Sequence, residues 1–335
     1  MAYKVFIDGE AGTTGLRLAE KLEKRDDIGL VHIGGDVRKD VGARLERFLE
    51  ADVCFLCLPD DEAIEIVKAA DKAGLQKVRI IDCSTAHRVS DGWSYGMPEL
   101  IRAKTDDTRI ANPGCYATGF IMCVRPLVEA GIIDKDAALS FYALSGYSGA
   151  GKAGIAEYEA AGAGSGQGHG GASDGDCETG HDLRAPRRYA LPQRHKHLPE
   201  IKKYSGLAEE PVFSPMICDF YNGMLTGVPL PRSCLRRGVS PADIREELAR
   251  YYEGRHVVKV RPLGAEFSES EGGGFLSADA FENRDDIEIM VTGNDDRIEI
   301  ISRYDNLGKG ASGAAIQNMN LSLGLPEEKG LVLGD

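Results

Sequence analysis

A cysteine stands where the sequence predicts the start of a helix. Cys115 follows the turn-forming Asn112-Pro113-Gly114 and opens an apolar run that predicts a helix to Ala130. Free N–H groups and the positive dipole end at a helix start stabilise a thiolate, which favours a thiol pKa below its usual value of about 8.5. Such a cysteine would be a nucleophile near neutral pH. The alternative is a small buried core residue, the commoner fate of a free cysteine.

Two histidines downstream could move protons for that nucleophile. His195 and His197 are two residues apart, so on an extended segment both rings would face the same side. The pair is also compatible with surface histidines or with a chelated metal, but no third ligand stands at a typical spacing. We therefore predict catalytic roles for Cys115, His195 and His197, and no metal ion.

A glycine-bearing loop near the N-terminus predicts a dinucleotide site. The segment Gly9-Glu10-Ala11-Gly12-Thr13-Thr14-Gly15 follows an apolar strand and opens a helix, where glycines allow a tight turn and close approach to a pyrophosphate. Its G-x-x-G-x-x-G spacing differs from the usual G-x-G-x-x-G, and an ordinary glycine-rich turn is the alternative. The predicted cofactor contacts in this loop are Gly9, Gly12, Thr13, Thr14 and Gly15.

The end of the second strand indicates which dinucleotide is preferred. An acid at this position would hold the ribose hydroxyl of NAD, whereas cations would accept the 2′-phosphate of NADP. Here Gly34-Gly35 is followed by Asp36 and then by Arg38 and Lys39, so both signals are present. The glycines in place of a strand-end acid, with two adjacent cations, favour NADP(H). A thiol beside a nicotinamide indicates acyl transfer coupled to hydride transfer.

Strands and helices alternate through the first third of the chain. This alternation with short turns predicts an α/β fold with a doubly wound, Rossmann-type parallel sheet. Strands are expected at residues 3–8, 31–33, 53–58 and 78–82, and helices at residues 16–24, 41–49 and 62–73.

The rest of the chain has strands at irregular spacing, which predicts a second α+β domain with a largely antiparallel sheet. Strands are expected at residues 138–144, 212–221, 257–260, 287–291 and 297–304, and helices at 152–161 and 241–253. An amphipathic helix over 309–323 would return to the first domain. We place the dinucleotide-binding domain at 1–114, the catalytic and oligomerisation domain at 115–304 and the returning segment at 305–335. The glycine-rich residues 162–180 read as a surface linker.

Charge and cysteine content restrict the class of protein. A formal net charge of −13 over 335 residues argues against nucleic acid as the main partner. The eight cysteines are thinly spread, which is typical of reduced thiols in a cytoplasmic protein. Cys54 and Cys57 form a C-x-x-C within a predicted strand, where they would point to opposite faces and share no metal. The sequence has neither a signal peptide nor an apolar stretch of membrane-spanning length, so we expect no membrane contact.

Several sequence blocks carry a family resemblance. The most specific is the cysteine signature from Ile110 to Pro126, and the other blocks are residues 82–88, 95–100, 145–152, 195–200 and 305–310. In this order they resemble the N-acetyl-gamma-glutamyl-phosphate reductases of arginine biosynthesis, and the chain is most similar to the family's shorter subgroup. It departs from the pattern at His87, where many members have an aromatic residue, and in the glycine-rich 162–180 segment.

The resemblance implies a reaction and its residues. The reaction is NADPH-dependent reduction of N-acetyl-gamma-glutamyl phosphate to N-acetyl-glutamate semialdehyde, with release of phosphate through a cysteine thioester. Cys115 would be the nucleophile and His197 the acid/base, with His195 the second candidate. Further cofactor contacts would be Ser84, Gly149, Asn306 and Asn318.

Polar residues near these blocks could hold the substrate. Arg88 and Lys152 are cations that could bind the phosphate or the substrate carboxylate, although each is equally compatible with a solvated surface charge. Asn112 and Glu200 complete the predicted substrate-binding set, and Glu200 could also orient the His197 ring. The expected partners are the small acyl phosphate, inorganic phosphate and further copies of the chain in a dimer or tetramer.

Two other functions remain open at this level. Aspartate-semialdehyde dehydrogenase carries out the same chemistry on a smaller acyl phosphate, but the blocks at 95–100 and 195–200 favour the acetylglutamyl enzyme. A non-catalytic NADP-binding redox sensor would use Cys115 as its sensing thiol. That function predicts cofactor binding without turnover and leaves His197 unexplained.

Overall fold

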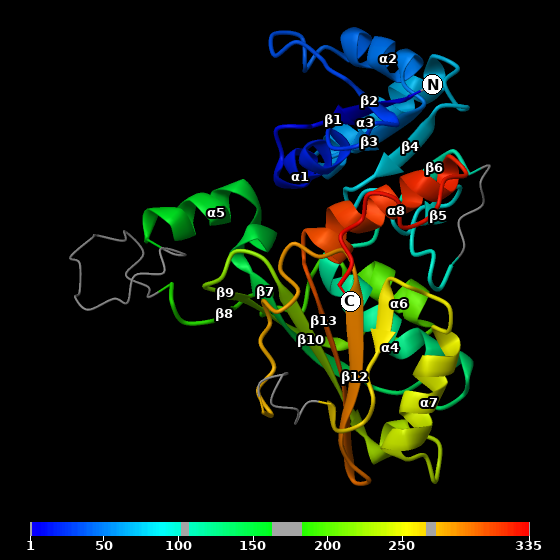
Figure 1. Ribbon diagram of the computed structural model, residues 1–335, viewed down its shortest axis with the longest axis vertical. Coiled ribbons are helices and arrows are strands. Elements are labelled where there is room, and N and C mark those ends of the chain that lie inside the picture. Colours follow the sequence, from blue (N-terminus) through cyan, green and yellow to red (C-terminus); the bar gives the residue numbers. More distant parts are fainter. Residues whose placement is uncertain (1, 102–106, 163–182, 266–272, 335) are drawn as a thin grey trace.

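A parallel six-stranded sheet forms the upper part of the molecule in Figure 1, in the order β2-β1-β3-β4-β6-β5. The computed structural model describes residues 2–101, 107–162, 183–265 and 273–334. The strands are β1 (Tyr3–Asp8), β2 (Ile28–Val31), β3 (Val53–Leu56), β4 (Arg79–Asp82), β5 (Ser94–Tyr95) and β6 (Arg109–Ala111). The helices between them are α1 (Thr13–Leu22), α2 (Val41–Glu50) and α3 (Asp60–Lys72). The predicted doubly wound sheet is confirmed.

Alternate strand residues pack against different helix layers. Cys54 points to the cluster beneath α2 and α3, whereas Phe55 and Cys57 belong to the cluster beneath α1 and the C-terminal helix. The prediction that Cys54 and Cys57 face opposite sides of the sheet is therefore confirmed. Because all strands are parallel, the loops after β1, β3 and β4 meet at one edge of the sheet.

The lower part of the molecule is a seven-stranded sheet in the order β11-β12-β13-β10-β7-β9-β8 (Figure 1). Its strands are β7 (Ser140–Gly146), β8 (Arg187–Arg188), β9 (Val212–Cys218), β10 (Met224–Pro231), β11 (Val258–Val260), β12 (Ile287–Asn294) and β13 (Arg297–Tyr304). Neighbours are antiparallel except for the pairs β7–β9 and β11–β12, which agrees with the predicted largely antiparallel sheet. The associated helices are α4 (Cys115–Glu129), α5 (Gly151–Ala160), α6 (Leu198–Ser205) and α7 (Pro241–Tyr251).

The central strand β10 was not predicted from the sequence. This strand contains Gly227, Pro229 and Pro231, residue types that argue against the middle of a sheet. Only Met224–Gly227 pair with β7, so both prolines lie where β10 has β13 as its single neighbour. On the other side of β10 no strand in the described part of the chain is paired at these positions, so the N–H groups that the prolines lack break no hydrogen bond there. At Gly227 the ring of Tyr142 occupies the space that a side chain would fill.

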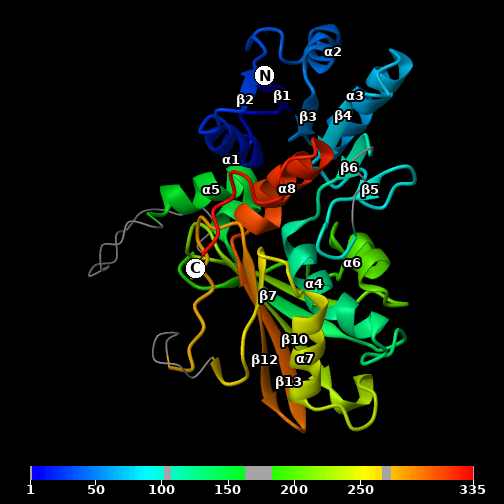
Figure 2. The same cartoon turned by 45° about the vertical axis from the view of Figure 1, so that its right-hand side comes forward.

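The chain ends in a π-helical turn (Gly308–Ser312) and helix α8 (Gly313–Ser322), which lie between the two sheets (Figure 2). The prediction of an amphipathic helix is wrong, because nearly every residue of α8 is buried. Ala315, Ile316 and Met319 pack against the first sheet. Polar side chains face protein as well: Gln317 donates to Glu99, which also forms a buried ion pair with Lys309.

Two sequence predictions are not decided by the fold. The glycine-rich segment falls almost wholly in residues 163–182, outside the described residues. The domain limits at 114/115 and 304/305 stay a prediction. In the described part of the chain, no helix is both long and apolar enough to span a membrane.

Candidate active site

A cavity of about 820 Å³ lies between the glycine loop of the first sheet and the start of α4. Its volume is in the range of a small-molecule or cofactor site. Both halves of the molecule contribute to its wall. The predicted site residues that line it are Gly12, Thr13, Thr14, Ser84, Arg88, Asn112, Cys115, Gly149, His195, His197 and Asn306.

Cys115 is the first residue of α4, as predicted, and the preceding Gly114 provides no side-chain cap. The expected low pKa is wrong for this structure. Burial raises the pKa of the Cys115 thiol to about 11, and the nearby Arg88 guanidinium and the Tyr116 amide offset this only in part. Removal from water outweighs the helix start because desolvation penalises the charged form. Cys115 is therefore a thiol at neutral pH.

His197 lies in the turn that leads into α6, not on the extended segment expected. Its Nε2 is 2.6 Å from the point that a Cβ on Gly114 would occupy, so the ring faces the start of α4. Burial lowers the pKa of His197 well below its usual value, and Arg88, His195 and Lys196 lower it further. The ring is therefore neutral at pH 7 and can accept a proton. Its buried Nδ1 has no hydrogen-bond partner among the described residues.

His195 supports the position of His197. Its Nδ1 accepts a hydrogen bond from the backbone N–H of His197 at 3.2 Å, and the two rings meet edge to face with centroids 4.7 Å apart. Nε2 of His195 is 3.5 Å from the hydroxyl of Tyr189. Burial, with Lys196 and Arg88, lowers the pKa of His195 to about 4, so this ring is also neutral at pH 7.

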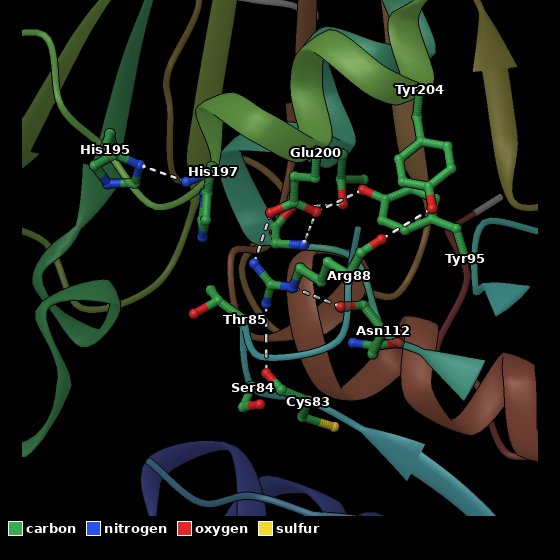
Figure 3. Close-up of polar contacts among 12 residues, drawn as sticks. Cys83, Ser84, Thr85, Arg88, Tyr95, Asn112, His195, His197, Glu200 and Tyr204 are labelled. Carbon is green, nitrogen blue, oxygen red and sulfur yellow. Dashed lines mark hydrogen bonds and ion pairs between the residues drawn. The ribbon is translucent and has the colours of Figure 1, made fainter. Parts of the chain in front are cut away.

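A buried carboxylate connects the elements around the thiol (Figure 3). Glu200 accepts hydrogen bonds from Arg88 Nη1 at 2.6 Å, from the Tyr95 hydroxyl at 2.6 Å and from the Gly114 amide at 3.1 Å. Arg88 also donates to the carbonyl of Asn112 at 2.9 Å and to that of Cys83 at 3.4 Å. Glu200 does not line the cavity. Its hydrogen bonds position Arg88 and the start of α4. That it binds substrate or orients the His197 ring stays a prediction.

The glycine loop has the shape of a dinucleotide cradle. Gly9 has φ +88°, and a Cβ there would collide with the carbonyl of Cys57. A Cβ on Gly15 would collide with the carbonyl of Gly9, so both positions require glycine. Helix α1 begins without a side-chain cap or an acid in its first turn, which leaves its N–H groups available to a phosphate. These residues fit the predicted cofactor.

Other predicted cofactor contacts are held by hydrogen bonds within the protein. The amide and hydroxyl of Ser84 bond to Asp82 at 2.8 and 2.9 Å, and Asn306 links the Ser148 hydroxyl to the Gly223 amide. Asn318 is fully buried, donates to Gly96 and Asn112, and does not line the cavity. In this structure it supports Asn112.

Three predicted cations do not line the cavity. Arg38 and Lys39 are exposed in the turn after β2, and Lys152 is exposed on α5. Cations that the sequence analysis did not single out take part in the wall: Arg187, Arg188 and Lys196. The Arg187–Arg188 doublet and the lysine between the two histidines were the available signals. Of these, Arg187 is paired with Glu157.

Comparison with known proteins places this arrangement in a class. Residues 4–108 match the family model described as "Semialdehyde dehydrogenase, NAD binding domain", and residues 115–306 match "Semialdehyde dehydrogenase, dimerisation domain". The aspartate semialdehyde dehydrogenase of Francisella tularensis has the same fold, with a TM-score of 0.70 at 15% identity over 96% of this chain and 99% of that one. The aspartate semialdehyde dehydrogenase II of Vibrio cholerae has a TM-score of 0.65 at 17% identity, over 96% of this chain and 98% of that one. Fold and site define an oxidoreductase of the semialdehyde dehydrogenase class.

Curated relatives narrow this class. The chain is 43% identical over 334 residues to N-acetyl-gamma-glutamyl-phosphate reductase 2 of Nostoc sp., which covers 98% of this chain and 99% of the relative. The reductase of Brucella ovis is 39% identical over 333 residues, covering 97% and 100%. The chain belongs to the N-acetyl-gamma-glutamyl-phosphate reductase family, as its sequence blocks predicted.

The protonation states predict how Cys115 reacts in the free enzyme. Its alkylation rate should rise about tenfold per pH unit from pH 7 to 9 and level off only near the thiol pKa of about 11, because only the thiolate reacts. His197→Asn should leave this midpoint unchanged, since the neutral ring is no counterion. Stopped-flow alkylation followed by peptide mass spectrometry measures both. An inflection below pH 8, or a midpoint that moves in His197→Asn, would contradict these states.

The turn after β2 predicts cofactor choice. Replacing both Arg38 and Lys39 with Ala should weaken NADPH binding about tenfold or more and leave NADH binding within about twofold, because only NADPH has a 2′-phosphate. Fluorescence titration with both cofactors tests this, with Lys152→Ala as an exposed-cation control. Equal losses for the two cofactors would show that the 2′-phosphate is bound elsewhere.

Proposed function

We propose that Cys115 attacks the acyl carbon of N-acetyl-gamma-glutamyl phosphate, that inorganic phosphate leaves, and that the thioester is reduced with NADPH to the semialdehyde. One observation supports this most directly. The Cys115 thiol at the start of α4, His197 and the glycine-loop residues 12–14 line one cavity. A cofactor in that loop would share this cavity with the thiol.

His197 can act as the general base for Cys115, whose raised pKa keeps it protonated at rest. A buried neutral imidazole beside a buried thiol can take the proton from Sγ as the sulfur attacks, so neither group has to be charged at rest. The free N–H groups in the first turn of α4 are donors for the oxyanion that develops. Arg88 stabilises the negative charge on sulfur, since it is the first of the groups that lower the Cys115 pKa.

Reduction follows departure of the phosphate. NADPH, when bound, supplies the hydride that reduces the thioester. His197 then donates its proton to the oxygen of the thiohemiacetal. As the C–S bond breaks and the aldehyde forms, His197 takes this proton back from the hydroxyl and passes it to the departing sulfur, which restores the thiol of Cys115 and the neutral imidazole. Arg188 and Lys196 line the cavity wall as exposed cations and would hold the anionic groups of the substrate. Asn112 is fixed by Ala311 and Asn318 beside the same cavity.

Two alternatives predict different behaviour. An aspartate-semialdehyde dehydrogenase would turn over the shorter acyl phosphate, but the relatives that match at 39–43% identity are acetylglutamyl enzymes. A redox sensor would bind NADPH without turnover. We also propose a cytoplasmic location, which is supported by seven free cysteines among the described residues. A dimer or tetramer is proposed from the matched dimerisation domain.

Cys115→Ser should abolish turnover and leave NADPH affinity nearly unchanged, because a hydroxyl is a far weaker nucleophile and the glycine loop is untouched. Turnover is measured in reverse, from the semialdehyde with phosphate and NADP⁺, and affinity is measured by fluorescence. Residual activity above about 1% of wild type would remove Cys115 from its role, since loss of a nucleophile typically costs several decades.

His197 and His195 should differ in their effects. His197→Asn should lower kcat by roughly two to four decades, which is the usual contribution of a positioned acid/base group. His195→Asn should change KM more than kcat, because His195 acts through the backbone of His197. Steady-state kinetics on the two variants separate these roles. A larger kcat loss in His195→Asn would reverse the assignment.

A further inference from the structure

Two cysteines lie side by side at the edge of the dinucleotide site. Cys57 follows β3 and Cys83 follows β4, and the register of these parallel strands runs through the pair Leu56↔Asp82. Cys57 and Cys83 therefore occupy the next register position. Both pack on the same apolar cluster and both line the cavity. The reaction proposed above uses neither thiol.

The spacing suits a covalent bond. Neighbouring strands lie about 4.8 Å apart, which is within the roughly 4.4–6.8 Å that separates the α carbons of a disulfide. The two side chains share one face of the sheet, and the Cys83 side chain is near enough to raise the pKa of Cys57. Both are partly exposed through the cavity, whereas Cys54 and Cys123 are buried. A small oxidant can therefore reach this pair.

We propose that Cys57 and Cys83 are a redox modification site, at which disulfide formation weakens NADP(H) binding. The oxidant is a small-molecule disulfide such as oxidised glutathione. The sulfur of Cys83 attacks it and forms a mixed disulfide while one thiol leaves. The sulfur of Cys57 then loses its proton and displaces the second thiol. Two protein thiols are oxidised and one external disulfide is reduced to two thiols.

This order of attack follows from the contacts of Cys57. The neighbouring Cys83 side chain and burial raise the pKa of Cys57 well above its usual value, so Cys57 keeps its proton until the mixed disulfide has formed. In Figure 3 the sulfur of Cys83 points away from Arg88, while its carbonyl faces the guanidinium.

The backbone around the pair transmits its state to the cofactor loop. The carbonyl of Cys57 closes against Gly9, where even a Cβ would collide, and Cys83 directly precedes Ser84 in the cavity wall. A new bond between the sulfurs shifts the backbone at the start of the loops that follow β3 and β4. The two equilibria are thermodynamically linked. If the disulfide lowers the affinity for NADP(H) by a given factor, bound NADP(H) lowers the equilibrium constant for disulfide formation by the same factor.

The experiment uses the full-length chain carrying Cys115→Ser, so that the nucleophile contributes nothing. After equilibration in glutathione redox buffers, peptide mass spectrometry identifies the Cys57–Cys83 link and fluorescence titration measures NADPH affinity. We expect Kd for NADPH to rise about tenfold on oxidation and to recover with dithiothreitol. Saturating NADP⁺ should raise the reduction potential by about 30 mV, which corresponds to that tenfold change for a two-electron couple.

Matched cysteine variants test whether the response to oxidation requires Cys57 and Cys83. Cys57→Ser and Cys83→Ser, each compared with its own reduced form, should lose the response, while Cys54→Ala removes a thiol from the opposite face of β3 and should retain it. The proposal is overturned if no Cys57–Cys83 link forms, if the link forms without a change in NADPH affinity, or if Cys54→Ala loses the response. Since every readout is cofactor binding or mass, a failure of the proposed acyl-phosphate reaction would leave this result intact.

Discussion

The geometry of the site depends on the buried carboxylate of Glu200. Its two oxygens bind Arg88, Tyr95 and the amide of Gly114, so α6, the segment after β4 and the start of α4 meet at one group. Removal of one partner of such a buried pair typically costs about 3–5 kcal/mol, because the remaining charge is left without compensation. The carboxylate thereby fixes Gly114, the residue that precedes Cys115. His197 is fixed by the same helix, at the turn that precedes α6.

The electrostatics of the site follow from this pairing. The charge of Arg88 is largely balanced by Glu200, so its field at Cys115 does not overcome the cost of burying a thiolate. Burial likewise keeps His197 neutral. A resting thiol and a resting imidazole avoid a buried ion pair and its desolvation penalty. In the proposed reaction, proton transfer from Cys115 to His197 therefore waits until substrate occupies the cavity and negative charge develops where the nearby donors can stabilise it.

The C-terminal segment also contributes residues to the site. Asn306 lies in the cavity wall, and Gly310 packs against Cys115, where a Cβ would come within 2.9 Å of the cysteine side chain. The buried Lys309–Glu99 pair anchors this segment to the first half of the molecule, and Asn318 holds Asn112. Because α8 is enclosed on all sides, its polar residues are structural partners, not an exposed face.

The sequence by itself determined the parallel sheet, the helix start at Cys115, the glycine loop and the family. These are local features: a period of two or 3.6 residues, a Pro-Gly turn and a glycine are read from neighbours in the chain. Tertiary structure decided that β10 is a central strand despite its prolines, that Glu200 binds Arg88, and that Arg188 and Lys196 line the cavity in place of Lys152. It also decided that Cys115 is a thiol at rest. Such properties depend on burial and on partners far away in the chain, and neither is encoded in local spacing.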